Sequence, residues 1–307
     1  MPKALALIGP TASGKTALAI EFAKTYPCEI ISIDSALVYR GMDIGSAKPT
    51  KAEQAGIAHH LIDICEPNEP YSAADFVKDA ESSMAEIASR NRLPFLVGGT
   101  MLYANALFYG IDEMPKADLD VRAEVMREAR ESGWPAMHAK LEAVDPVTAE
   151  RLSINDSQRI GRALEVYRQT GRPLSSFQTG KKDRYPDIVK IGLMPTDRAK
   201  LHMAIRKRFL AMIEAGFLDE VRTLMARDDF DASTPAMRSV GYRQAILYLE
   251  GKTTKEAFIE DACTATRRLA KHQITWMRSM PGLILIDAQA QDVRERFFEK
   301  AREALNL

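Results

Sequence analysis

The sequence predicts an α/β fold in which a parallel sheet core with helical crossovers is interrupted by an inserted helical subdomain. Three observations support this prediction. Short apolar runs alternate with helical stretches, a complete phosphate-binding loop follows the first run, and strand signals disappear between residues 113 and 186. Buried parallel strands appear in a sequence as continuous apolar runs, because helices cover both faces of their sheet.

Five short apolar runs are expected to form the strands: residues 4–8, 30–33, 95–97, 188–193 and 283–286. Ligands of open parallel sheets bind beyond the carboxyl ends of the strands. The first three runs end at the phosphate loop, at Asp34-Ser35 and at Gly98-Gly99-Thr100. We therefore expect these three stretches to line one crevice.

The stretch after the first run matches the phosphate loop at every fixed position, with Gly9, four variable residues, and then Gly14, Lys15 and Thr16. It lies between a predicted strand and a predicted helix over residues 17–23. Backbone N–H groups and the helix N-terminus favour oxyanions there. Lys15 would reach terminal phosphate oxygens, and the Thr16 hydroxyl would bind Mg²⁺. The pattern predicts a P-loop NTPase-like core with a polyphosphate or diphosphate site formed by Gly9, Pro10, Thr11, Ala12, Ser13, Gly14, Lys15 and Thr16.

The segment 113–187 is expected to form the helical subdomain. Residues 118–141 and 146–169 carry helical periodicity, and breaks are expected at Pro115, Gly133-Trp134-Pro135 and Gly171-Arg172-Pro173. The core would consist of residues 1–112 and 188–307. Its second part would be mostly helical after an N-cap at Asp197.

Composition is that of an ordinary globular chain. The 307 residues are 46% hydrophobic and 27% charged, with 42 basic and 42 acidic side chains, so a global basic field is absent. No segment approaches the roughly 20 apolar residues of a membrane helix. Three separated cysteines indicate neither a disulfide framework nor a zinc cluster. We expect a cytoplasmic protein without a membrane segment.

Basic residues nevertheless gather in three places. Residues 159–184 hold seven basic and two acidic side chains, and residues 198–208 hold five basic and no acidic ones. Arg267, Lys271 and Arg278 share one stripe of a predicted helix. A single stripe is commonly a solvated face, but three such clusters in a neutral chain favour a polyanionic partner. Trp276, on the same helix, is expected to be a core residue rather than a platform for base stacking.

The phosphate loop by itself leaves several function classes open. Asp34 could help to organise Mg²⁺, as in nucleotide kinases, or accept a proton from a nucleophile. A small-molecule kinase would leave residues 113–187 and the basic clusters without a role. A non-catalytic RNA-binding module would leave the phosphate loop without one. Composition and spacing do not separate these readings.

Longer motifs resemble those of the bacterial tRNA dimethylallyltransferases, also called tRNA isopentenyltransferases of the IPP transferase family. The resemblance covers essentially the whole chain in order. The stretches that carry it are GPTASGKT (9–16), SIDSALVYRGMDIGSAKP (32–49), HHLID (59–63), YSAADF (71–76), VGGTMLY (97–103), NDSQRIGRALEVYRQTGRPLS (155–175), GFLDEV (216–221), RSVGYRQ (238–244) and HQITWMR (272–278).

The resemblance implies a prenyltransferase with Mg²⁺ as cofactor. It would move a dimethylallyl group from dimethylallyl diphosphate to the exocyclic amine of the adenosine 3′-adjacent to the anticodon of tRNA, releasing diphosphate. The catalytic residues implied are Asp34, Lys15, Thr16, Thr100 and Arg208, with Asp34 taking the amine proton. The implied contacts with the tRNA anticodon stem-loop are Asp34, Ser35, Ala36, Leu37, Thr100, Arg122, Gln158, Arg159, Ile160, Gly161, Arg162, Arg238, Ser239, Val240, Gly241, Tyr242 and Arg243.

Two positions depart from the family pattern. Leu37 stands where glutamine is common, and Ala204 stands where arginine is common. Arg208 would then carry more of the diphosphate load. Neither change affects Asp34 or the phosphate loop, so the chemistry is expected to be intact. We expect the protein to act as a monomer.

Overall fold

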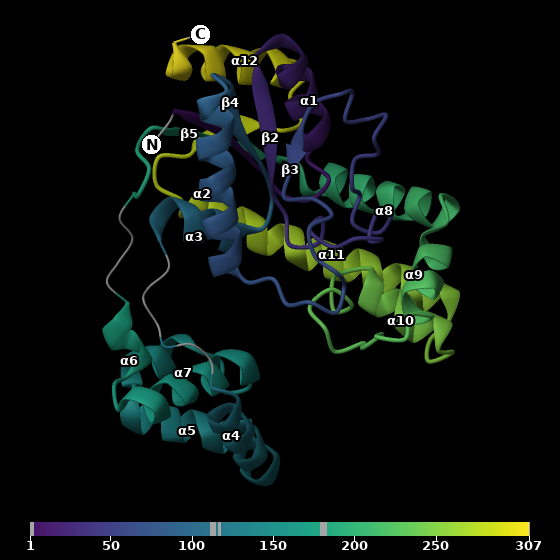
Figure 1. The fold of residues 1–307 in the computed structure, drawn as a ribbon. Helices are drawn as coiled ribbons and strands as arrows, with labels where there is room; N and C mark the ends of the chain where they lie inside the picture. The colour runs from purple at the N-terminus through teal and green to yellow at the C-terminus, as the bar shows by residue number, and fades with distance from the viewer. Residues whose placement is uncertain (1–2, 111–114, 116–117, 179–182, 307) are drawn as a thin grey trace. The chain divides into compact units, whose positions relative to one another are not determined.

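The computed structural model describes residues 3–110, 115, 118–178 and 183–306. The chain divides into two compact units. One combines Met1–Tyr109 with Asp183–Leu307, and the other is Gly110–Lys182 (Figure 1). We call the first the sheet unit and the second the helical unit.

Six strands form the sheet in the part of the chain that the structure describes, in the order β3-β2-β4-β1-β5-β6. All neighbouring pairs run parallel. The strands are β1 (Ala4–Ile8), β2 (Cys28–Ile33), β3 (His59–His60), β4 (Leu93–Gly98), β5 (Ile188–Met194) and β6 (Ile284–Asp287). The five expected strands are confirmed, and the parallel sheet with its helices confirms the α/β, P-loop-like fold class.

Helices cover both faces of the sheet. Side chains of α2 (Ala73–Ser89) and α3 (Met101–Tyr109) pack with Ala6, Ile8 and Leu96 in one buried cluster. Side chains of α1 (Lys15–Thr25) and α12 (Val293–Leu305) pack with Leu5 and Leu7 in another. Alternate residues of one strand therefore point to opposite faces, and both faces are apolar.

A third buried cluster joins α8 (Arg198–Glu214), α9 (Phe217–Met225), α10 (Tyr242–Leu249) and α11 (Lys255–Arg278) to the loop after β2. These helices lie together as green to yellow ribbons in Figure 1. The expected N-cap at Asp197 is confirmed, since its carboxylate accepts hydrogen bonds from the backbone N–H groups of Ala199 (2.8 Å) and Lys200 (3.1 Å).

The helical unit has its own apolar core, which includes Val125, Met137, Leu141 and Ile160. Its helices are α4 (Leu119–Ser132), α5 (Trp134–Val144), α6 (Pro146–Arg151), α7 (Ser157–Thr170) and the 3₁₀ turn η1 (Leu174–Phe177). Gly133, with φ 78°, ends α4 at the expected break. The expected helical periodicity over 146–169 corresponds to two helices, because the chain leaves the helix after Arg151 and Asp156 caps a new one.

One strand was not expected. β3 comprises only His59 and His60, which pair with Ile30 and Ile31 of β2. Two half-buried histidines form no apolar run, so the sequence pattern carried no signal for this strand. Among the described residues, no helix has the length and apolarity needed to cross a membrane.

Candidate active site

A cavity of about 610 Å³ lies in the sheet unit, beyond the carboxyl ends of β1, β2 and β4. In the sheet order, β2 and β4 lie on one side of β1 and β5 lies on the other, so the strand order reverses next to β1. Ligands of open parallel sheets usually bind at such a reversal. Residues of the phosphate loop, Asp34-Ser35 and Gly98-Gly99-Thr100 all contribute to its lining. The expected meeting of these three stretches is therefore confirmed.

The phosphate loop connects β1 to α1, as the motif requires. Gly14, with φ 83°, precedes Lys15 at the start of α1, and Ala12 also has a positive φ of 62°. The Lys15 ammonium donates a hydrogen bond to the carbonyl oxygen of Pro10 at 2.8 Å. The exposed Thr16, in the first turn, lines the cavity. Because α1 starts here, its unpaired N–H groups are oriented toward an anion bound in the loop.

Lys15, Asp34 and Arg208 form an electrostatically coupled group in the cavity wall. Burial lowers the pKa of Lys15 to about 8, opposed by the negative charge of Asp34 and assisted by the positive charge of Arg208. Burial raises the pKa of Asp34, while hydrogen bonds from Ala36 and the charge of Lys15 oppose this shift. Burial lowers the pKa of Arg208, and Asp34 opposes that change. Two partly desolvated cations and one carboxylate thus share the site.

Asp34 directly follows β2, and its Oδ1 accepts hydrogen bonds from the backbone N–H groups of Ala36 (2.8 Å) and Leu37 (3.4 Å). Nearby, the Thr100 hydroxyl oxygen accepts a hydrogen bond from the Ser35 N–H at 3.0 Å. Thr100 follows β4, so this contact ties the carboxyl ends of two adjacent strands together. Leu37, one of the two departures from the family pattern, lines the cavity with its apolar side chain.

Arg208 lies on α8 and donates a hydrogen bond to the Thr11 hydroxyl of the phosphate loop. The other basic residues of the 198–208 cluster lie outside the cavity lining, and Arg206 pairs with Glu260 at 3.2 Å. Ala204 is exposed and also lies outside that lining. Only one member of this cluster therefore faces the site.

Gln273 of α11 is a site residue that the sequence analysis did not identify. Its Oε1 accepts a hydrogen bond from the Thr11 N–H at 2.9 Å, and its Nε2 donates to the Gly99 carbonyl at 2.8 Å. It thereby connects the phosphate loop to the loop after β4. Gly99 permits the approach, because a Cβ there would lie 2.7 Å from Gln273 Nε2. The HQITWMR stretch contains this residue, but nothing in the local pattern indicates its partners.

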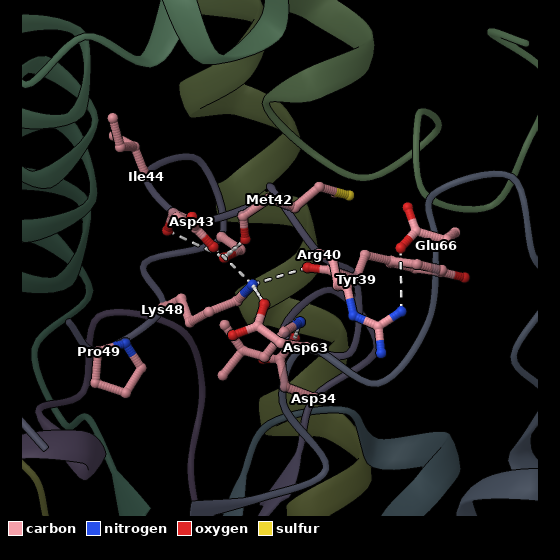
Figure 2. A network of polar contacts seen from close by, with 12 residues as sticks. Asp34, Tyr39, Arg40, Met42, Asp43, Ile44, Lys48, Pro49, Asp63 and Glu66 are labelled. Atoms are coloured by element: carbon pink, nitrogen blue, oxygen red, sulfur yellow. Dashed lines mark hydrogen bonds and ion pairs between the residues drawn. The ribbon is translucent and has the colours of Figure 1, made fainter. Parts of the chain in front are cut away.

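The segment that follows Asp34 is held in place by Lys48. The Lys48 ammonium donates to the Tyr39 carbonyl (2.8 Å) and to the carboxylates of Asp43 (2.7 Å) and Asp63 (2.5 Å), as Figure 2 shows. Only 5% of the Lys48 side chain is exposed, so three acceptors compensate a nearly buried charge. Nothing in the local sequence pattern indicates this role for Lys48.

Residues 238–242 form another part of the cavity wall. Arg238 is exposed, Gly241 has a φ of 95°, and Tyr242 is fully buried at the start of α10. Arg243 is exposed and lies outside the cavity lining. Five of the six residues expected in this segment therefore border the cavity.

Helix α11 presents Thr266, Leu269, Gln273 and Trp276 to the cavity. The expectation that Trp276 is a core residue is wrong, because 38% of its surface is exposed and it lines the opening. Apolar periodicity could not distinguish a core position from a cavity wall, since both are apolar positions on one helix face. The Arg267 side chain, from the basic stripe, pairs with Glu260 at 2.6 Å.

The remaining predicted tRNA contacts belong to the helical unit. Arg122 of α4 and Arg162 of α7 both pair with the buried Glu165, at 3.6 and 3.4 Å. At the start of α7, Gln158 and Arg159 are exposed, and the Arg159 guanidinium pairs with Asp156 at 2.5 Å. Ile160 and Gly161 are buried. Only part of the 158–162 stretch therefore presents side chains to solvent.

Divalent-metal ligands at the cavity are hard oxygen donors. Thr16 provides a hydroxyl and Asp34 a carboxylate, and both line the cavity. Within the described ranges, no cluster of three or more histidine, cysteine or acidic side chains could hold a metal ion. This donor set fits Mg²⁺, which takes few protein ligands and completes its shell with water and substrate phosphates.

Comparisons with known proteins agree with this arrangement. A family model described as IPP transferase matches residues 37–280, and one described as isopentenyl transferase matches residues 2–66. A tRNA dimethylallyltransferase of Thiobacillus denitrificans is 54% identical over 298 residues, covering 96% of this chain and 95% of the relative. The tRNA dimethylallyltransferase of Methylibium petroleiphilum is 54% identical over 308 residues, covering 98% and 94%.

Solved structures give the same family. The full-length tRNA isopentenylpyrophosphate transferase of Bacillus halodurans superimposes with a TM-score of 0.71 at 37% identity, covering 100% of this chain and 99% of that one. A eukaryotic dimethylallyltransferase, described as acting on tRNA, superimposes with a TM-score of 0.80 at 25% identity, covering 99% and 79%.

Proposed function

Because this chain belongs to the IPP transferase family, we propose that it transfers a dimethylallyl group from dimethylallyl diphosphate to tRNA. The acceptor is the exocyclic amine of the adenosine 3′-adjacent to the anticodon, and diphosphate is released. One observation carries the proposal beyond family membership. Thr11, Lys15 and Thr16 of a complete phosphate loop line the same cavity as the half-buried carboxylate of Asp34, so a diphosphate leaving group and a proton acceptor can act on one substrate pair.

The donor's diphosphate binds in the phosphate loop. Loop N–H groups, the Lys15 ammonium and the Arg208 guanidinium surround it with donors and positive charge. Negative charge accumulates on the diphosphate as the allylic C–O bond breaks. Fixed donors placed before the reaction stabilise that charge without reorganisation, which is the main source of catalysis at such sites.

Asp34 accepts the proton of the attacking amine. The lone pair of an adenine amine is delocalised into the ring, so the amine is a weak nucleophile until its proton has an acceptor. As the new C–N bond forms and the C–O bond breaks, the proton moves to the Asp34 carboxylate. Burial raises the pKa of Asp34, which makes it a stronger base than an exposed aspartate. The Ala36 and Leu37 N–H groups orient it through Oδ1.

Thr100 orients the acceptor side through its hydrogen bond to Ser35. The Thr16 hydroxyl would hold Mg²⁺, which would add charge neutralisation at the diphosphate. The Lys15, Arg208 and loop donors perform the same task from the protein side.

RNA recognition requires the adenine to leave its stack, which costs a few kcal/mol. We assign the segment 238–243, of which residues 238–242 border the cavity, to contacts beside the unstacked base. We assign the exposed Gln158 and Arg159 of the helical unit to contacts with the phosphate backbone, and Arg122 and Arg162 to the same surface. Ile160 and Gly161 lie on the buried face of that helix, where Ile160 packs in the core of the helical unit. The reaction is expected to take place in the cytoplasm.

A single transfer assay tests the proposal. The protein is incubated with Mg²⁺, an unmodified anticodon stem-loop and either labelled dimethylallyl diphosphate or labelled ATP. The expected result is label in the RNA from the first donor, release of diphosphate, and no hydrolysis of ATP. Turnover of ATP without RNA transfer would favour the kinase reading instead. A stem-loop with guanosine at the target position is the matched control and should remain unlabelled.

A further inference from the structure

The Glu220 carboxylate joins two separate segments that border the cavity. Its Oε2 accepts hydrogen bonds from the backbone N–H groups of Asp43 (2.9 Å) and Ile44 (2.6 Å). Its Oε1 accepts from the Gly45 N–H (3.1 Å) and from the Tyr242 hydroxyl (2.6 Å). One carboxylate on α9 therefore receives four hydrogen bonds, three from the loop after β2 and one from the start of α10.

Three consecutive N–H groups that converge on one anion form a concave backbone site, a conformation that usually needs its anion to persist. Here the anion is a side chain of the same chain. Gly45 is required for the close approach, since a Cβ there would lie 2.2 Å from Phe217 Cε2 and 2.7 Å from Tyr242 Cζ. The loop backbone thus lies directly against two aromatic rings, and no larger residue fits.

Both segments held by Glu220 border the cavity. Gly45, Ser46 and Ala47 line it, and Gly241 and Tyr242 line it next to them. Tyr242 is fully buried, and burial together with the neighbouring Glu220 raises the pKa of its hydroxyl, so that the hydroxyl stays a hydrogen-bond donor. Glu220 makes no hydrogen bond to the phosphate loop in the described parts of the chain, where Gln273 and Arg208 provide the connections.

We propose that Glu220 is a positioning residue for the RNA acceptor: it holds the loop after Asp34 against the 238–242 segment, and so fixes the part of the cavity wall against which an unstacked adenine lies. The inference rests on the proposed transfer to tRNA. The carboxylate acts through the backbone of residues 43–45 and through the Tyr242 hydroxyl, and not by touching either substrate. Its effect is therefore confined to the acceptor side of the cavity.

Replacing Glu220 tests this inference. Glu220→Gln keeps the side-chain shape but turns one oxygen into an NH₂ group that faces backbone donors. With several charge-assisted hydrogen bonds lost, KM for the anticodon stem-loop should rise by about 10- to 100-fold. KM for dimethylallyl diphosphate should change by less than about twofold, because its loop is held by other residues. Asp219→Asn is the matched control, since Asp219 is exposed, carries the same charge on the same helix, and pairs through its carboxylate with Arg222 of α9.

A second variant uses the other partner. Tyr242→Phe removes one of the four donors and should raise KM for the stem-loop by a smaller factor. The double variant Tyr242→Phe, Glu220→Gln should show less than the product of the two single effects, because both remove the same contact. Both single substitutions preserve side-chain volume, so the test does not depend on Glu220→Ala folding.

The outcomes separate the inference from the proposed function. If the wild-type protein transfers no dimethylallyl group to RNA, the proposed function fails. If the wild type transfers normally and Glu220→Gln keeps both Michaelis constants, the inference is overturned, even if the variant melts at a lower temperature. An equal rise in both Michaelis constants would also overturn it. A rise confined to the RNA substrate, with Asp219→Asn unchanged, supports it.

Discussion

The pH dependence of donor binding follows from the position of Lys15. Burial lowers the pKa of Lys15 in the free protein to about 8, even though Asp34 opposes that shift. Only the protonated ammonium attracts diphosphate, so donor capture should weaken as pH rises through this value. With a pKa of about 8, about nine tenths of the free protein carries the charge at pH 7 and about one tenth at pH 9.

The expected magnitude is therefore a fall of about tenfold in kcat/KM for dimethylallyl diphosphate between pH 7 and pH 9. Saturating donor should remove most of this loss. Bound diphosphate places negative charge beside Lys15 and raises its pKa in the complex, so kcat should stay nearly constant over the same range. The two pH profiles thus report the free protein and the complex separately.

The assay measures initial rates of transfer to a saturating stem-loop from pH 6.5 to pH 9.5, at constant ionic strength and at several donor concentrations. Lys15→Arg, whose guanidinium stays charged, should lose the alkaline fall in kcat/KM. Lys24→Gln changes an exposed lysine on the same helix and should keep it. A kcat/KM that stays flat to pH 9.5 in the wild type, or that falls equally in Lys15→Arg, would refute the reasoning.

Three further substitutions test other parts of the structure. Asp34→Asn should reduce transfer by about 10²-fold or more while leaving stem-loop affinity unchanged. Because Asp34 raises the pKa of Lys15, this variant should also lose donor binding at a lower pH than the wild type. Near-normal turnover of this variant would assign Asp34 to metal positioning. Arg159→Ala should flatten the salt dependence of stem-loop binding by about one unit of slope, because one phosphate contact is lost; an unchanged slope in filter binding at several salt concentrations would make the start of α7 a solvated face. Lys48→Met should lower the free energy of unfolding by about 2 kcal/mol, because Asp43 and Asp63 lose a nearly buried partner but remain partly exposed themselves. Urea unfolding measures this change, and Lys51→Met, at an exposed lysine, is the control.

Local signals determined a large part of the fold. Four of the expected strands are mostly apolar and lie buried where helices cover both faces of the sheet. The fifth, β6, is at the edge of the sheet, and its Ile284 and Leu285 are exposed. The Asp197 cap and the turn at Gly133 depend on a few neighbouring residues, so residue type alone predicts them. β3 was missed because two half-buried histidines form no apolar run, and their partners in β2 are almost 30 residues away in the sequence.

Within the site, the sequence predicted several of the groups that the structure brings together at the cavity. The phosphate loop was predicted from its motif, and Asp34 from its position directly after β2. Both lie at the cavity because parallel strands bring their carboxyl ends together. The roles assigned to individual RNA-contacting residues stay predictions. Ile160 is buried and Arg162 pairs with Glu165, so the motif does not indicate which side chains of the stretch reach solvent.

Only the tertiary structure revealed the residues that hold these groups in register. Gln273 meets Thr11 and Gly99 across 262 and 174 positions of the chain, and Glu220 meets Gly45 across 175. Such contacts leave no local periodicity, since a glutamine or glutamate on a helix has the same pattern whether it faces water or a distant loop. The groups predicted to carry the chemistry lie in short sequence motifs. The distances between those motifs depend on side chains whose partners become neighbours only after the sheet and its helices have packed.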